Sequence, residues 1–577
     1  MEDRWITDWE PSTRFPLYTR ANAGEVIPEP CSPLGWQLVW EKGAAPGWAD
    51  GVHRWGSFTP DESDPERPDY VACFGGYFYL NASAIRLVGV RTPGMSAEAM
   101  DAAFLGEHPD VPPYVPQVGD ERPELTEKIE ATMGWIMSAT EEPAELAEDR
   151  AKMLEIRANR PDLGAASDAE LVARARSMSP VIREFFEPYY IYGTASSIGP
   201  GILGELCAAI DPSLPGRLIS GIGDIDSAPP SHDMWAMSRT INASPTLSEA
   251  FDAGLDSIRE RLADIEGGAD LLADLAEFVA EHGARGPSEW DAASATWEIA
   301  PEVVLAAVNA MRHAGDELSP ANRHAGAVAD REAAEAEARA ALAGNDEALA
   351  TLDMGLRVAK IFVPTRERTK LTEMMAIHEI RLPMYELGRR MVERGAIDEA
   401  RDVFLLLDAE LDAFIASPET WSDTLARRKT DFASLAELQD PFIIHGEVPP
   451  LSEWEARTAA IENVSAGEVL AGVPGSPGVI TGKARVVTDP GDPRGLEPGE
   501  ILVAPLTDPS WTPLFVPAAA VVVEVGAPLS HAVIVSREFG VPCVTGVFQA
   551  AGRIPDGAII SVDGNSGSVT IVELPAG

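Results

Sequence analysis

The sequence has little cysteine and lacks any apolar run long enough to cross a membrane. Its four cysteines, Cys31, Cys73, Cys207 and Cys543, are widely separated and form no Cys-x-x-Cys pair. This spacing favours free thiols in a reducing compartment and gives no sign of a metal site. The N-terminus is polar and shows no signal-peptide pattern. We therefore expect a cytoplasmic protein that neither enters a membrane nor holds a metal ion.

Basic residues are also scarce. The 577 residues include 45 Lys and Arg against 92 Asp and Glu, which gives a formal net charge of −47. A surface this acidic repels polyanions, so we expect neither nucleic acid nor anionic membranes as partners. Chemistry on a phosphate group would require a locally basic site. With 45% apolar residues, a chain of this length has room for several domains with cores of their own.

A strand–turn–helix pattern lies in the C-terminal part of the sequence. Val521–Val525 is a short run of mostly β-branched residues, which is typical of a strand buried on both faces. Gly526 breaks the run, and Ser530 stands where a helix N-cap belongs, before about two turns of helix over Ala532–Phe539. His531 is therefore predicted to lie at a helix N-terminus, just beyond the end of a core strand.

A histidine in this position suits phosphoryl chemistry. The start of a helix presents unpaired backbone N–H groups and a partial positive charge, and both favour an anion. His531 could attack a phosphoryl group, and the same donors would stabilise the phosphate that it gains. Taken alone, however, a Ser-His pair is more often a histidine that only caps a turn.

Three segments around His531 resemble a known domain. They are Thr507–Phe515 (TDPSWTPLF), Glu524–His531 (EVGAPLSH) and Ser536–Pro542 (SREFGVP). Their order and spacing are similar to those of the swivelling phosphohistidine domain in the phosphoenolpyruvate synthase, pyruvate phosphate dikinase and rifampicin phosphotransferase group. The resemblance implies that His531 is catalytic and carries phosphate from one active site to another. It also implies that Ser530, Gly526 and Thr507 belong to the phosphohistidine loop.

The rest of the chain predicts a multidomain α+β fold. Residues 1–115 contain short β-like runs, and residues 116–445 show the helical spacing of apolar residues. A Pro-rich linker is expected over 446–474, and short strands return over 475–577. Resemblance to the rifampicin phosphotransferase group implies a largely helical acceptor-binding domain with a β-rich N-terminal part. It further implies a small C-terminal α/β swivelling phosphohistidine domain.

Three smaller features complete the expected organisation. Aromatic residues alternate around a Gly-Gly pair in Phe74–Asn81, which predicts a hairpin. The Ala/Glu/Arg tract Asp330–Leu349 predicts a solvated arm of a helical hairpin or a lid. Gly221–Ser227 resembles a dinucleotide loop only superficially, because it lacks the third glycine and a preceding strand. A role for this segment as a pocket loop stays open.

Two charged clusters are candidates for an acceptor site. Arg366 and Lys370 are four residues apart and would share a helix face, where their charge would stabilise the oxygens of a transferred phosphoryl group. A similar Arg-x-x-x-Lys pair lies at the acceptor site of the rifampicin phosphotransferase group, which implies catalytic roles for both. The alternative is a pair of surface cations bridged to nearby carboxylates. The segment with Arg285, Glu289 and Asp291 also resembles that group and implies either structural pairing or substrate binding by Arg285 and Glu289.

The sequence offers no counterpart of the ATP-grasp unit or of the phosphoenolpyruvate-binding barrel of this group. In this respect it resembles the split enzymes phenylphosphate synthase and alkylphenol-phosphorylating (4-methylphenyl phosphate) synthase. The resemblance implies that a separate ATP-grasp subunit binds ATP and Mg²⁺, and that this chain binds no cofactor tightly. His531 would pass phosphate to a small aromatic alcohol or phenol, such as 4-methylphenol.

Two other functions stay open. In one, the chain is a phosphocarrier or regulatory protein, in which His531 relays phosphate to another protein and residues 1–450 form an interaction scaffold. In the other, the chain is an inactive homologue, which the intact segment around His531 disfavours. His282 and His378 are candidate general bases, although a histidine near a helix end, such as His282, is also favoured electrostatically without any catalytic role.

Overall fold

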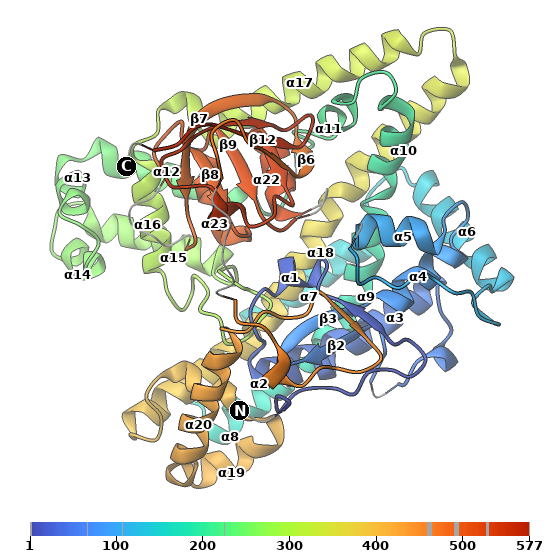
Figure 1. Cartoon of the computed structure of the whole chain (residues 1–577). Helices are drawn as coiled ribbons and strands as arrows, with labels where there is room; N and C mark the ends of the chain where they lie inside the picture. The colour runs from blue at the N-terminus through green and yellow to red at the C-terminus, as the bar shows by residue number, and fades with distance from the viewer. Residues whose placement is uncertain are drawn as a thin grey trace. The chain divides into compact units, whose positions relative to one another are not determined.

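The computed structural model describes residues 3–65, 67–106, 108–223, 225–457, 464–489, 496–526 and 530–575 (Figure 1). The chain divides into two compact units. Unit 1 consists of Met1–Ala195, Trp290–Ser294 and Arg368–Ala459, and unit 2 consists of Ser196–Glu289, Ala295–Glu367 and Ala460–Gly577. The long helix α18 (Asp346–Glu393) belongs to both units, because the boundary between Glu367 and Arg368 falls within it.

Unit 1 combines helices with a small sheet. Besides its part of α18, its helices are α1 (Ala23–Val26), α2 (Pro33–Gly35), α3 (Ala45–Trp55), α4 (Ala82–Arg91), α5 (Ala97–Phe104), α6 (Pro123–Ser138), α7 (Ala144–Ala158), α8 (Asp168–Arg176), α9 (Ser179–Ala195), α19 (Leu411–Ala416) and α20 (Ser422–Leu435). A π-helix, η1 (Trp36–Ala44), leads into α3. The antiparallel sheet has the order β2-β3-β1-β4, from β1 (Leu17–Thr19), β2 (Val71–Phe74), β3 (Tyr77–Asn81) and β4 (Ile443–His445).

The strands β2 and β3 form the hairpin predicted from the Gly-Gly pair. Gly75 and Gly76 connect them with φ angles of 58° and 79°, a backbone conformation that favours glycine because a side chain would clash there. Phe74 and Tyr77 are the paired residues next to the turn. The predicted hairpin is therefore confirmed.

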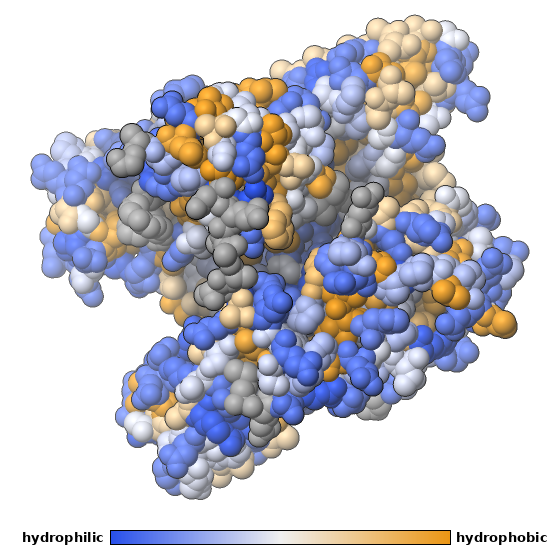
Figure 2. All heavy atoms as spheres, in the orientation of Figure 1, coloured by the Kyte–Doolittle hydropathy of each residue, from blue (hydrophilic) through white to orange (hydrophobic). Residues whose placement is uncertain are grey.

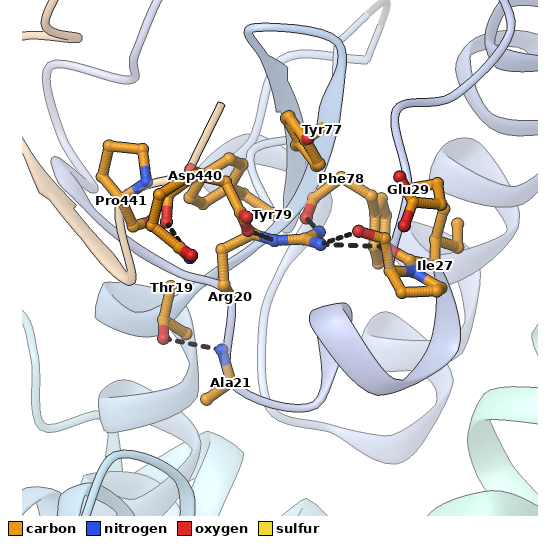
Figure 3. A network of polar contacts seen from close by, with 12 residues as sticks. Thr19, Arg20, Ala21, Ile27, Glu29, Tyr77, Phe78, Tyr79, Asp440 and Pro441 are labelled. Atoms are coloured by element: carbon orange, nitrogen blue, oxygen red, sulfur yellow. Dashed lines mark hydrogen bonds and ion pairs between the residues drawn. The ribbon is translucent and has the colours of Figure 1, made fainter. Parts of the chain in front are cut away.

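A buried arginine ties the sheet of unit 1 to the segment before β4 (Figure 3). Arg20 is 5% exposed and forms an ion pair with Asp440. Its guanidinium also donates hydrogen bonds to the carbonyl oxygens of Ile27, at 3.0 Å, and Phe78. The same group lies 5.1 Å from the centre of the Tyr77 ring. Because a guanidinium carries five donors in a planar fork, this one side chain satisfies groups from several separate segments at once.

Unit 2 contains a group of helices before its own sheet. Besides its part of α18, these are α10 (Ile198–Cys207), α11 (Leu214–Leu218), α12 (Pro229–Ala243), α13 (Pro245–Asp252), α14 (Ile258–Ala263), α15 (Gly268–His282), α16 (Glu302–Met311) and α17 (Pro320–Ala341). α17 and α18 form a helical hairpin, in which Arg339 and Asp353 pair at 2.7 Å. The predicted helical arm is confirmed, but it is not wholly solvated, because Ala334 and Ala338 are buried in a hydrophobic cluster.

The C-terminal part of unit 2 is an eight-stranded sheet in the order β5-β12-β11-β7-β8-β9-β10-β6. Its strands are β5 (Val469–Ala471), β6 (Val473–Ser476), β7 (Val479–Val486), β8 (Ile501–Ala504), β9 (Ala520–Val523), β10 (Cys543–Thr545), β11 (Ile559–Asp563) and β12 (Ser568–Glu573). The four neighbours β7, β8, β9 and β10 are parallel. Helix α21 (Thr512–Phe515) lies between β8 and β9, α22 (His531–Phe539) between β9 and β10, and α23 (Ala550–Arg553) between β10 and β11.

Both faces of the central strands are buried, as the β-branched run predicts. Val521 and Val523 of β9 face a core that also contains residues of α12, α13, α14, α15 and α16. Val522, between them, faces a second core with residues of β11 and β12. Successive side chains of a strand point to opposite faces. The C-terminal sheet and the preceding helices therefore share one hydrophobic core.

The predicted fold class, a largely helical chain with sheets in its N-terminal and C-terminal parts, is confirmed. The two units, however, do not follow the expected boundaries at 115, 445 and 474. Residues 196–289 and 295–367 of the expected helical domain group with the C-terminal sheet. The end of the expected linker is not a linker in the structure. It contains β5 and the start of β6, which pair with β12 and β10 of the C-terminal sheet.

Among the described residues, no helix is both long enough and apolar enough to span a membrane. Hydrophilic residues cover much of the face shown in Figure 2, in keeping with the net charge of −47.

Candidate functional site

His531 lies at the carboxyl edge of the parallel strands of unit 2. Because β8, β9 and β10 are parallel neighbours, their carboxyl ends meet at one edge of the sheet. Thr507 follows β8, Gly526 follows β9, and Thr545 is the last residue of β10. Helix α22 begins at His531. In open α/β sheets this edge is where ligands bind, and a helix N-terminus there adds backbone donors for an anion.

The imidazole of His531 is held between two hydroxyl groups. Its Nδ1 lies 3.1 Å from Thr507 Oγ1, and its Nε2 lies 3.0 Å from Thr512 Oγ1. The ring meets Phe515 edge-on, with centroids 5.9 Å apart, and the residue is 7% exposed. Since a hydroxyl can donate or accept, the two threonines orient the ring in either tautomer and one ring nitrogen keeps a lone pair. Such a nitrogen is a suitable nucleophile for phosphorus.

The structure places the other predicted loop residues beside His531. Ser530 is the N-cap of α22, with an extended backbone (φ −67°, ψ 161°), but its hydroxyl makes no capping hydrogen bond. A Cβ added at Gly526 would come within 2.0 Å of Thr545 Oγ1, so the close approach of β10 requires glycine at this position. Residues 527–529 of the predicted loop lie outside the described part of the chain.

Asp508 joins the segment that holds His531 to the helices of unit 2. Its Oδ2 accepts a hydrogen bond from the backbone N–H of Ser288 at 2.9 Å, and its Oδ1 accepts one from the N–H of Ser510 at 2.9 Å. Burial raises the pKa of Asp508 from 3.8 to about 6, and the carboxylate of Glu289 acts in the same direction. These hydrogen bonds hold Asp508 in place. They thereby position the neighbouring Thr507, whose hydroxyl contacts the ring of His531.

The raised pKa of Asp508 predicts a pH dependence of stability. The folded chain holds this proton more tightly than the unfolded chain, so the stabilisation is present below about pH 4 and is lost as the pH rises through about 6. The full effect is about 3 kcal/mol, at about 1.4 kcal/mol per pKa unit. We expect the melting temperature of Asp508→Asn, relative to the wild type, to rise between these pH values in scanning calorimetry. The matched control is exposed Asp274→Asn on α15, and an equal rise in that variant would contradict the prediction.

Arg285 and Glu289 form a buried ion pair in unit 2. The atoms Arg285 Nη1 and Glu289 Oε1 are 3.5 Å apart, and both side chains are 1% exposed. Breaking such a pair leaves an uncompensated buried charge, which is strongly destabilising. Asp291 is not part of the pair, because it belongs to unit 1 and accepts a hydrogen bond from the backbone N–H of Ser32 at 2.9 Å. The ion pair supports the structural role of Arg285 and Glu289. Substrate binding by these two residues stays a prediction.

Arg366 and Lys370 lie one turn apart on α18, and both are half-buried. Helical residues four apart share a face, so the predicted common face is present. The turn before Arg366 packs near the helix of His531, because Val363 of α18 and Ile534 of α22 belong to the same hydrophobic cluster.

The loop around Gly221 contributes to an open cavity of about 210 Å³ in unit 2, which supports the interpretation as a pocket loop. The lining residues are Gly223, Ile225, Asp226, Ala228, Pro229, His232, His324 and Glu538. Glu538 is near the end of α22 and lies 2.6 Å from His324 Nδ1, while its other oxygen accepts from Gly223 N at 3.3 Å. The cavity therefore adjoins the end of α22 that is distant from His531.

His282 pairs with a carboxylate instead of standing alone as a base. Its Nε2 lies 2.8 Å from Asp233 Oδ2. His282 also belongs to a group that could hold a metal ion, together with Asp233 and Glu281. The possible ligand atoms of these three residues lie within 4.8 Å of one another, but both carboxylates are exposed. His378, the other candidate base, is fully buried on α18.

The sequence identified His531 and Thr507 but not the other groups around the imidazole. Thr512 and Phe515 both lie within the TDPSWTPLF segment, so the resemblance pointed to the right stretch without assigning their contacts. Thr545 lies next to Gly526, and only because β10 pairs with β9. A signal existed for Thr545 as well, since polar residues at the carboxyl ends of neighbouring parallel strands meet at one edge.

Comparison with protein families matches two parts of the chain. Residues 191–367 match the fourth domain of rifampicin phosphotransferase, and residues 496–567 match the mobile domain of PEP-utilising enzymes. The first match covers most of the helices of unit 2, and the second contains Thr507, Thr512 and His531.

Three relatives illustrate the extent of the similarity. A rifampicin phosphotransferase of Streptomyces sviceus is 30% identical over 386 residues, which are 64% of this chain and 42% of the relative. The prodigiosin synthesizing transferase PigC of Serratia marcescens is 28% identical over 368 residues, 62% of this chain and 40% of the relative. An uncharacterized protein of Mycobacterium tuberculosis is 41% identical over 199 residues, 34% of this chain and 22% of the relative. The chain thus spans less than half the length of each of these relatives.

Proposed function

We propose that this chain carries a phosphoryl group from ATP to the hydroxyl of a small phenolic acceptor. Its matches to the fourth domain of rifampicin phosphotransferase and to the mobile domain of PEP-utilising enzymes support phosphoryl transfer. A nitrogen of His531 attacks a phosphorus atom of ATP, the N–P bond forms as a P–O bond breaks, and the rest of the nucleotide leaves with the oxygen of that bond. The acceptor oxygen then attacks the same phosphorus, the N–P bond breaks, and the hydroxyl proton leaves to solvent. The product is an aryl phosphate.

The observation that carries this proposal is the setting of His531. The ring is oriented by two hydroxyls at the N-terminus of α22, at the carboxyl edge of parallel strands. A nucleophile there gains a phosphate beside backbone donors that stabilise it. In this proposal ATP and Mg²⁺ bind to a separate ATP-grasp polypeptide, which phosphorylates His531, as in phenylphosphate synthase and 4-methylphenyl phosphate synthase.

The acceptor step relies on Arg366 and Lys370. Two cations on one helix face would steady the phosphoryl oxygens while the group moves to the acceptor. Their position in an acidic chain supports this role, because the net charge of −47 otherwise repels phosphate.

An aromatic acceptor is supported by the rings of unit 1. Trp40, on the π-helix η1, lies 4.3 Å from the ring of Phe78 and 5.4 Å from that of Trp290, between centroids. The buried indole N–H groups of Trp36 and Trp40 have no hydrogen-bond partner among the described residues, which is unusual for buried donors. A phenol also ionises at about pH 10, well below an aliphatic alcohol, which makes it the easier nucleophile.

The test mixes the chain with its ATP-binding partner, Mg²⁺ and ATP labelled in the transferred phosphate, with and without 4-methylphenol. We expect acid-labile label on the chain that is lost when 4-methylphenol is added and is recovered as aryl phosphate. Label that persists with every member of a broad panel of hydroxyl compounds would contradict the acceptor step and favour a phosphocarrier. An absence of label with an active partner would overturn the phosphohistidine itself.

A further inference from the structure

Two buried hydroxyl groups near His531 lack the partners that buried polar groups normally have. Ser530 is 2% exposed and Thr545 is fully buried, and neither Ser530 Oγ nor Thr545 Oγ1 has a hydrogen-bond partner among the described residues. A hydroxyl removed from water without a partner is destabilising, so such groups in a folded protein call for an explanation.

The two hydroxyls converge on one point. A Cβ built on Gly526 would lie 2.0 Å from Thr545 Oγ1 and 3.0 Å from Ser530 Oγ. Both oxygens therefore face the backbone of Gly526, and the absence of a side chain at this residue is what leaves room for them. The three residues come from three different places: the end of β10, the loop after β9 and the start of α22.

The hydroxyl of Ser530 is in position to cap α22 but does not do so. The residue has the extended backbone of an N-cap, yet its side chain accepts no hydrogen bond from the first turn. α22 has nine residues, so its first turn keeps unpaired backbone N–H groups that favour an anion. Two hydroxyls without hydrogen-bond partners among the described residues thus lie at the carboxyl edge of the sheet, next to the N-terminus of the helix that begins at His531.

We propose that Ser530 Oγ and Thr545 Oγ1 hold the phosphoryl group of phosphorylated His531, each donating one hydrogen bond to a phosphoryl oxygen. The inference rests on the proposed function, because it assumes that His531 gains phosphate. Both hydroxyls act as positioning groups: they orient the phosphoryl oxygens and favour their charged form. Gly526 lets both hydroxyls approach its backbone, and Thr545 becomes a member of a site to which the sequence had not assigned it.

The test forms the phosphohistidine chemically, with phosphoramidate on the full-length chain, so that neither the ATP-binding partner nor the acceptor is needed. The phosphorus NMR signal of phosphorylated His531 is then titrated with pH in the wild type, Thr545→Val, Ser530→Ala and the double variant. Loss of a donor to the dianion disfavours the dianion, so the titration midpoint is expected to move upward in each single variant and further in the double variant. Thr545→Ser, which retains the hydroxyl, is expected to stay close to the wild type.

Ser536→Ala is the matched control. Ser536 also lies on α22 and is fully buried, but its Oγ is not one of the atoms next to Gly526. The control midpoint is expected to equal that of the wild type. Equal midpoints in all variants would overturn the proposal, and so would a wild type that phosphoramidate leaves without phosphohistidine at His531. Failure of transfer from ATP to a phenol, by contrast, would contradict the proposed function and leave these midpoints unchanged.

Discussion

Replacing His531 by alanine will abolish acid-labile phosphate on this chain, even with ATP, Mg²⁺ and an active ATP-binding partner present. The reason is that the variant lacks the nitrogen that Thr507 and Thr512 orient at 3.1 Å and 3.0 Å, and no backbone donor can replace a nucleophile. In the proposed function the acceptor receives phosphate only from the imidazole, so transfer to 4-methylphenol is expected to be lost as well. The measurement is the amount of label on the chain and in the aryl phosphate.

The control for this result is His313→Asn. His313 is exposed in the same unit, so its loss removes an imidazole without touching the carboxyl edge of the sheet. This variant is expected to be labelled like the wild type. His531→Ala is expected to melt below the wild type, because the buried hydroxyls of Thr507 and Thr512 lose their partner, so both variants are compared at a temperature where calorimetry shows them folded. Acid-labile label on His531→Ala would show that another residue receives the phosphate.

The part of the site that the sequence predicted is the part encoded locally. A β-branched run, a glycine, an N-cap serine and a two-turn helix follow one another between Val521 and Phe539, so ordinary strand and helix signals locate His531. The structure has β9 at Ala520–Val523 and α22 at His531–Phe539, close to the expected positions. Burial of the strand on both faces was likewise readable from composition alone.

The contacts that the sequence could not predict join residues far apart in the chain. Asp508 meets the backbone of Ser288, and Thr545 reaches Gly526 only because β10 pairs with β9. The division into units was also missed for this reason. The core behind β9 is completed by side chains of α12 to α16, such as Leu275 and Leu305. Amphipathic spacing predicts which face of a helix is buried but not which element packs against it.

Replacing Arg366 or Lys370 by alanine will leave phosphorylation of His531 intact and slow transfer to the phenol. In the proposed function the two cations stabilise the charge of the phosphoryl group during transfer, and loss of one such group in a preorganised site lowers the rate by about 100- to 1,000-fold. The proposed donor step uses a site on the ATP-binding partner, so phosphorylation of His531 is expected to stay at the wild-type rate. Rapid mixing of the labelled chain with 4-methylphenol separates the two steps, because the decay of acid-labile label then reports the acceptor step alone.

Lys360→Ala is the matched control for this prediction, since Lys360 is an exposed cation on α18, the same helix. If long-range charge alone matters, Lys360→Ala will slow the transfer as much as Lys370→Ala does. If the shared face of Arg366 and Lys370 matters, the control will transfer like the wild type. Arg366→Lys should recover part of the rate, because it restores the charge but not the planar fork that binds two phosphoryl oxygens at once. An unchanged rate in both alanine variants would remove these two residues from the acceptor step and favour a chain that only relays phosphate from His531.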